Sequence, residues 1–288
     1  FAILDVAYDV VQLVLSAEPA IAFPAVRFHW STANVGVSGT APGEIGGTRF
    51  VAGTGILLVG AADQDTDEYD RHVIAHELGH YLEHRFSRSD SIGGPHTRGD
   101  QLDLRVAFGE GWGNALSAMV TGQSVYRDVS GLRQSKGFGF DVEGPLPLDP
   151  NPNPGWYSEE SVQEILYDLF DDSPFDAAQD GLTLGFAPIF AVLTSKQRMA
   201  PALTSIFTFI NSLKAEQPAA VPQIDSIVNA HDILPIVDDY GGNQTNFGEP
   251  TNADIDPADL TAVYSTLAVG TTVNVCSLDA YSSHVTSA

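Results

Sequence analysis

The sequence predicts an α+β fold in which a few short strands precede a mostly helical remainder. Segments with strand-like composition cluster early in the chain, at 26–30, 48–52 and 56–59, and glycine-rich turns separate them. Segments with helical periodicity occupy most of the chain from about Tyr69 onward. Strands that are followed by a run of helices are typical of α+β proteins, so we expect a small N-terminal sheet beside a helical lobe.

The individual elements follow from periodicity and from breaker residues. We expect an amphipathic helix over 1–15 and further helices near 69–86, 102–121, 158–170, 188–193, 200–213 and 221–230. The stretch 131–155, rich in glycine and proline, is expected to be irregular, and a late strand is expected at 272–276, around the single cysteine, Cys276. We expect an N-terminal lobe at 1–122 and a helical lobe with a loop-rich tail at 123–288, with a single domain as the alternative.

The composition excludes some classes of binding partner. The 288 residues include 13 basic and 37 acidic side chains, for a net charge of −24. Such a surface repels nucleic acid and anionic membranes, so neither is expected as a partner. No apolar run reaches the roughly 18 residues of a membrane span. The chain begins at Phe1 without a signal peptide, so we expect a processed or truncated form, located in the extracellular space, the periplasm or the cell envelope.

The strongest motif is His76-Glu77-Leu78-Gly79-His80, within the helix expected at 69–86. Residues four apart on a helix lie about 40° apart around the axis and about 6 Å along it, so His76 and His80 can converge on one zinc ion. Glu77 is turned about 100° from His76 and can accept a proton from a metal-activated water. The flanking residues are uncharged, so the three polar side chains lie in an otherwise apolar helix. Burying them there without partners would cost free energy, which favours a metal as the partner.

A third ligand is expected from the next helix. Four polar residues on it fall on one stripe by their spacing: Asp103, Glu110, Asn114 and Ser117. Glycines at 109, 111 and 113 are poor helix formers and indicate that another backbone packs very close. Both features are explained if this helix lies against the first and Glu110 completes a zinc site.

These residues resemble the zincin metallopeptidases, in the gluzincin branch of thermolysin-like and fungalysin-like enzymes, where a downstream Glu often sits in a Gly-Glu-Gly-Trp-like context. The metzincin branch is excluded because Glu83 and Phe86 stand where it has glycine and histidine. His84 lies about 12 Å along the axis from His76, too far to share the ion. The resemblance places a supporting acid four residues after the Glu. Here Asn114 stands there, and Asp103 shares its stripe.

The resemblance implies a zinc-dependent peptidase in which Glu77 acts as general base and a peptide or protein substrate lies along an edge strand, at 56–59 or 48–52. The Gly-x-Met-Glu-Asn strand of the aminopeptidase branch is absent, which favours an endopeptidase. Two alternatives remain: a zinc hydrolase of another amide or ester, and a non-catalytic zincin-fold binding module with structural zinc. An intact Glu77 argues against the second, because a structural site needs no general base.

Two further assignments are left with alternatives. By analogy with the donor His of fungalysin-like enzymes, Tyr157 is expected to stabilise the developing oxyanion, or else to pack as a staple at a helix start. The acidic loop at 63–70 could bind calcium, but it lacks the Gly and Glu that define an EF-hand loop. We therefore favour helix capping by Asp67 or a neighbour, with the remaining charges solvated.

Overall fold

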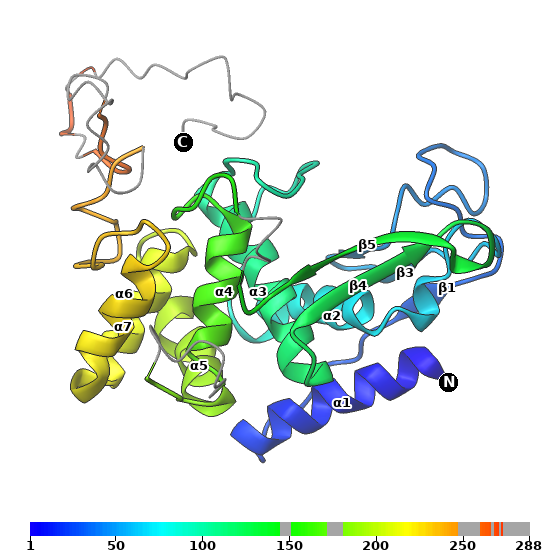
Figure 1. Ribbon diagram of the computed structural model, residues 1–288, viewed down its shortest axis with the longest axis horizontal. Coiled ribbons are helices and arrows are strands. Elements are labelled where there is room, and N and C mark those ends of the chain that lie inside the picture. The colour runs from blue at the N-terminus through cyan, green and yellow to red at the C-terminus, as the bar shows by residue number, and fades with distance from the viewer. Residues whose placement is uncertain (145–150, 172–180, 247–259, 266–267, 271, 273–288) are drawn as a thin grey trace.

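The computed structural model describes residues 1–144, 151–171, 181–246, 260–265, 268–270 and 272. These residues form helices and two small sheets, which confirms the predicted α+β class (Figure 1). No helix in the described ranges is both long and apolar enough to cross a membrane. Cys276 and nearly all of the strand expected at 272–276 lie outside the described residues.

The first sheet has the strands expected early in the chain: β1 (Phe28–Trp30), β2 (Arg49–Val51) and β3 (Gly55–Leu58). Their order is β1-β3-β2, with β1 parallel and β2 antiparallel to β3. Because β3 is paired on both sides, 56–59 cannot be the edge along which a substrate lies, and that alternative is wrong. Of the two proposed edges, only β2 remains.

The second sheet is a hairpin of β4 (Val125–Ser130) and β5 (Lys136–Asp141), where the sequence predicts irregular structure from residue 131. Two of the glycines that prompted that prediction, Gly137 and Gly139, lie inside β5. A Cβ on Gly137 would approach Asp128 O to 2.1 Å, and one on Gly139 would approach Tyr126 O to 2.7 Å. These glycines therefore permit a close approach of the two strands, and composition alone cannot separate that role from a loop.

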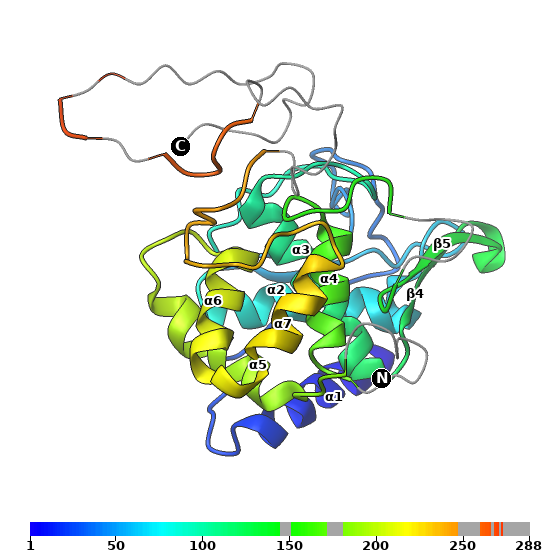
Figure 2. The ribbon, with the colours of Figure 1, turned by 60° about the vertical axis from the view of Figure 1, so that its left-hand side comes forward.

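The helices lie close to their predicted positions. They are α1 (Ala2–Ala17), α2 (Arg71–Phe86), α3 (Leu104–Thr121), α4 (Glu159–Asp168), α5 (Phe186–Val192), α6 (Ile206–Glu216) and α7 (Val221–Asn229). The largest difference is α6, expected from residue 200. Ser205 and Thr208 form a capping box that fixes its start instead. Figures 1 and 2 show α5, α6 and α7 gathered on the side of α4 away from the hairpin.

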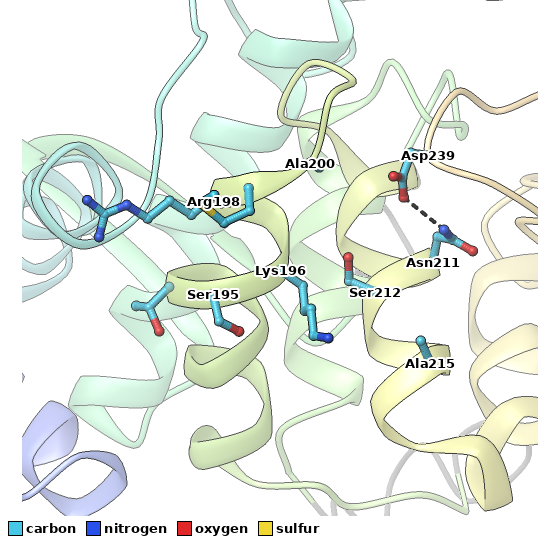
Figure 3. Close-up of a pocket in the computed structure, with 10 residues that line it drawn as sticks. Ser195, Lys196, Arg198, Ala200, Asn211, Ser212, Ala215 and Asp239 are labelled. Atoms are coloured by element: carbon cyan, nitrogen blue, oxygen red, sulfur yellow. Dashed lines mark hydrogen bonds between the residues drawn. The ribbon is translucent and has the colours of Figure 1, made fainter.

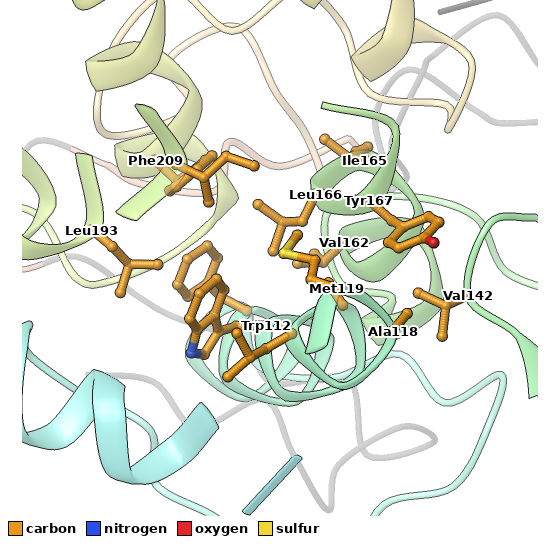
Figure 4. Close-up of a cluster of buried hydrophobic side chains, with 14 of the residues drawn as sticks. Trp112, Ala118, Met119, Val142, Val162, Ile165, Leu166, Tyr167, Leu193 and Phe209 are labelled. Carbon is orange, nitrogen blue, oxygen red and sulfur yellow. The ribbon is translucent and has the colours of Figure 1, made fainter. Parts of the chain in front are cut away.

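The core is organised around α3, which packs against α2 on one side and α4 on another. Trp112 and Phe108 of α3 are fully buried. Figure 4 shows apolar side chains of α3, α4 and α6 meeting there, among them Met119, Val162 and Phe209. The predicted lobe boundary falls at the end of α3, between helices that share this core. The division into two lobes stays a prediction.

Two glycines let α2 and α3 approach closely. A Cβ on Gly79 of α2 would lie 3.0 Å from Gly113 Cα of α3, and one on Gly113 would lie 2.7 Å from His76 Nδ1. Trp112 Nε1 donates to Gly79 O at 3.0 Å and ties the helices at this point. On another side of α3, a Cβ on Gly111 would meet Val162 of α4 at 2.6 Å.

We expect Gly113→Ala to lower the melting temperature, because the added methyl must displace the His76 ring or separate the helices. Overpacking of this kind typically costs about 1–3 kcal/mol, against a gain of about 1 kcal/mol in helix propensity. Gly109→Ala is the matched control on the same helix, since its Cβ would make only an ordinary 3.6 Å contact with Glu83. Thermal denaturation of both variants measures the difference, and equal melting temperatures would contradict the close-contact explanation.

Candidate metal centre

Three side chains from α2 and α3 converge on one point. His76 Nε2 lies 3.0 Å from His80 Nε2, and Glu110 Oε2 lies 3.2 Å from the first and 3.3 Å from the second. The two histidines meet because they are one helical turn apart, and Glu110 reaches them because α3 packs so closely on α2. The sequence-predicted ligand residues are therefore brought together.

Hydrogen bonds around His76 indicate which ring nitrogen carries the proton. His76 Nδ1 lies 2.8 Å from Asn114 Oδ1, while Asn114 Nδ2 donates to Gln163 Oε1 at 2.9 Å. Because the amide presents an acceptor to Nδ1, that nitrogen bears hydrogen and Nε2 keeps its lone pair. The lone pair then faces the other two members of the group. Asn114, the residue four after Glu110, thus contacts His76, and its supporting role at the site stays a prediction.

The triangle of these atoms fits a metal ion. Ligands at about 2.1 Å from a tetrahedral centre are about 3.4 Å apart, close to the 3.0–3.3 Å observed. Three acceptor atoms so close together repel one another unless a cation or protons lie between them. His76, His80 and Glu110 therefore form a group that can hold a metal ion.

The electrostatics favour positive charge at this point. Burial disfavours a charged His80, but the carboxylates of Glu110, Glu77 and Glu83 outweigh it and raise the pKa of His80 to about 10. Burial likewise opposes the charge on Glu110, yet the two histidines hold its pKa well below the usual value. Without an ion, a proton on His80 would offset the Glu110 charge. A metal ion would replace that proton.

Glu77 lies beside this group without belonging to it. It is buried, and its Oε2 accepts a hydrogen bond from Phe50 N of β2 at 2.5 Å. The edge of β2 that is not paired with β3 therefore faces α2 at the position of Glu77. His84, excluded as a ligand by its axial distance, is exposed, and its ring lies 5.6 Å from that of Phe50.

Two residues that the sequence did not single out also approach the centre. His96 Nε2 lies 3.4 Å from Glu110 Oε2 and 3.6 Å from Glu159 Oε2 at the start of α4. The loop that carries His96 is anchored nearby, because Arg98 pairs with Glu160 and Asn153 Nδ2 donates to Gly99 O at 2.7 Å. The sequence could have indicated His96, because it is a histidine in the loop between the helices that carry His76 and Glu110.

Two other predicted residues have contacts elsewhere. Tyr157 is buried, its ring packs on Trp156 at 5.1 Å, and its pKa is raised by burial and by the charge of Asp232. Asp103 is the N-cap of α3, where its side chain accepts from Arg105 N and pairs with the Arg105 guanidinium. None of these contacts is with His76, His80 or Glu110, so the roles expected for Tyr157 and Asp103 at the site stay predictions.

A separate surface pocket lies between the π-helical turn η3 (Leu193–Gln197) and α6, lined by residues such as Lys196, Arg198 and Asn211 (Figure 3). It contains none of the metal-centre residues, so the chemistry of the chain is inferred from the centre itself. No model of a known protein family matches the chain, and no match was found among curated proteins.

We expect Glu110→Ala to lose bound metal and His84→Ala to retain it. Glu110 supplies one corner of the triangle, whereas His84 is exposed and turned toward Phe50. Losing an outer partner of a ligand typically costs about 10–100-fold in metal affinity, and losing Glu110 itself should cost more. Elemental analysis of the purified variants and zinc titration measure this. Equal metal loss in both variants would show that the ligand assignment is wrong.

Proposed function

We propose that the protein is a zinc-dependent peptidase. The observation that carries the proposal is the triangle of His76, His80 and Glu110 with Glu77 beside it, on two closely packed helices. Two neutral imidazoles and one carboxylate are a ligand set typical of catalytic zinc, and they leave a coordination position open. A small sheet followed by a motif helix and a ligand helix also supports a zincin-like fold.

The chain's own residues supply the rest of the chemistry. Zinc, when bound, polarises a carbonyl group and lowers the pKa of water. Glu77 then accepts a proton from the attacking water and donates it to the departing amine. Phe50 N holds one oxygen of its carboxylate, so the other is left for proton transfer in a fixed direction. Asn114 keeps His76 in the tautomer that presents Nε2.

A peptide is the substrate that the surroundings favour. The edge of β2 that is not paired with β3 faces Glu77, as the hydrogen bond from Phe50 N shows. An extended peptide can add to such an edge by main-chain hydrogen bonds, which would carry its backbone past the general base. Because edge pairing needs neither peptide terminus, this arrangement supports an endopeptidase.

His96 is our candidate for the donor that stabilises negative charge on the carbonyl oxygen. Its Nε2 lies 3.4 Å from Glu110 Oε2, and Gly94 O, 3.1 Å from its Nδ1, can keep the ring oriented. The ring of Tyr157, the sequence-based candidate, instead packs on Trp156. Proximity therefore favours His96.

Glu77→Gln should leave zinc content near that of the parent and abolish peptide hydrolysis. Glutamine keeps an oxygen that can accept from Phe50 N, but it cannot take the proton. Loss of a positioned general base typically costs about 10²–10⁴-fold in rate. Zinc analysis and turnover of a quenched-peptide panel test this, and a variant retaining most of its turnover would falsify the assignment of Glu77.

His96→Ala and Tyr157→Phe separate the two donor candidates. With zinc supplied at saturation, we expect His96→Ala to lower kcat by about 10²–10³-fold, as removal of one oxyanion donor typically does. Tyr157→Phe removes only a hydroxyl and should leave kcat close to that of the parent. The opposite pattern would restore Tyr157 as the donor and leave His96 as a partner of Glu110 and Glu159.

A further inference from the structure

A second group of possible metal ligands lies at the N-terminal end of α2. It comprises Asp65, Asp67, Asp70 and Asp128, each with one carboxylate oxygen within 4.8 Å of the others. The first three precede α2 in the chain, and Asp128 comes from β4. Asp70 precedes His76 by six residues, about 9 Å along a helix axis, so this group is separate from the zinc centre.

Hydrogen bonds hold these carboxylates in place. Gly131 N, just after β4, donates to Gln64 O at 2.6 Å, and Asp65 forms a β-bridge with Ser130. Val129 N donates to Asp70 Oδ2 at 3.2 Å. The loop and the hairpin are therefore joined around the cluster, and its carboxyl groups do not stand free in solvent.

Two of the four residues are buried, Asp65 and Asp128 are half-buried, and the cluster lacks the donors that its charges require. Asp67 is only 3% exposed and Asp70 only 6%. Asp67 Oδ2 accepts from the Thr48 hydroxyl, but Asp67 Oδ1 is buried without any hydrogen bond, as is Asp65 Oδ1. Within the described ranges, no lysine, arginine or histidine forms an ion pair with any of the four.

Capping does not explain these residues. Asp70 is the N-cap of α2, yet its side chain makes no capping hydrogen bond and turns to Val129 instead. Asp67 belongs to the short helix η1 (Asp67–Tyr69) and faces Thr48. The sequence-based preference for capping with solvated charge is therefore wrong at both positions.

The charges oppose one another in the absence of an ion. Burial, reinforced by the charges of neighbouring carboxylates, raises the pKa of Asp67 to about 8 and that of Asp70 to about 7, even though each accepts a hydrogen bond that lowers it. Burial and the charge of Asp65 also raise the pKa of Asp128 to about 6. A bound cation would reverse each of these penalties by supplying the missing positive charge.

We propose that Asp65, Asp67, Asp70 and Asp128 bind a calcium ion that joins the loop before α2 to β4. The donors are all carboxylate oxygens, which suit a hard divalent cation. Calcium binds oxygen at about 2.3–2.6 Å, so ligands across its coordination shell are up to about 4.6–5.2 Å apart, and the cluster fits within that span. The site does not depend on the proposed peptidase activity.

The test compares the parent with Asp67→Asn and with Asp63→Asn, all as full chains retaining zinc. Asp63 lies in the same loop but is exposed and outside the cluster, and its positive φ and its hydrogen bond from Arg133 N are both compatible with asparagine. Thermal denaturation with and without CaCl2, calorimetric titration with CaCl2 or MgCl2, and zinc analysis are the readouts.

With calcium at about a hundred times its dissociation constant, the parent and Asp63→Asn should gain about 5–10 °C in Tm. Asp67→Asn should gain little, and its calcium affinity should fall at least about tenfold, because one charged ligand is lost. Without calcium, Asp67→Asn should be at least as stable as the parent, since a buried repulsion is relieved. No calcium-dependent shift in the parent, an equal shift in both variants, or equal binding of magnesium would overturn the proposal.

Discussion

The close contact of α2 with α3 is the constraint on which the metal centre depends. Glycines at 79 and 113 allow the two backbones to meet, and the hydrogen bond from Trp112 to Gly79 O ties them together. A wider separation would withdraw Glu110 from the histidines, because a carboxylate on a neighbouring helix has limited reach. On another side of α3, Gly111 allows α4 to pack closely. Gln163 of α4 accepts a hydrogen bond from Asn114, which in turn contacts His76. The ligands are thus positioned by helix packing rather than by a loop.

Excess negative charge is the second organising feature of the molecule. The net charge is −24, and part of the negative charge lies in groups beside α2 and not on solvated surface. Glu110 lies beside His76 and His80, and a group of four aspartates lies before the first turn of α2. Around His80, the charges of Glu77, Glu83 and Glu110 stabilise a cation strongly enough to overcome burial. Buried charges are retained in proteins where a counter-charge meets them. A metal ion held by these groups would be a counter-charge that serves several acceptors at once.

Much of the metal centre could be predicted from the sequence, because it depends on helical spacing. His76 and His80 follow from one turn of a helix, and Glu110 from a polar stripe flanked by glycines. The parts that could not be predicted involve segments with no periodicity. His96 reaches the centre only because its loop is anchored to α4. The hairpin was missed because glycines inside a strand resemble those of a loop, and Asp128 could not be joined to 65–70 without that hairpin.

Strand β4 connects the two proposed ion sites. Tyr126 and Asp128 are two residues apart, so their side chains project from the same face of the strand. The ring of Tyr126 packs against His72 and His76, at 5.2 and 6.4 Å between centroids, while Asp128 enters the carboxylate cluster. An ion that fixes Asp128 therefore also fixes the aromatic wall beside His76. Because Asn114 Oδ1 accepts from Nδ1 of the same imidazole, His76 is restrained by a hydrogen bond to α3 and by packing against β4. The orientation of His76, a candidate metal ligand, thus depends on packing against a strand that also contributes Asp128 to the carboxylate group before α2.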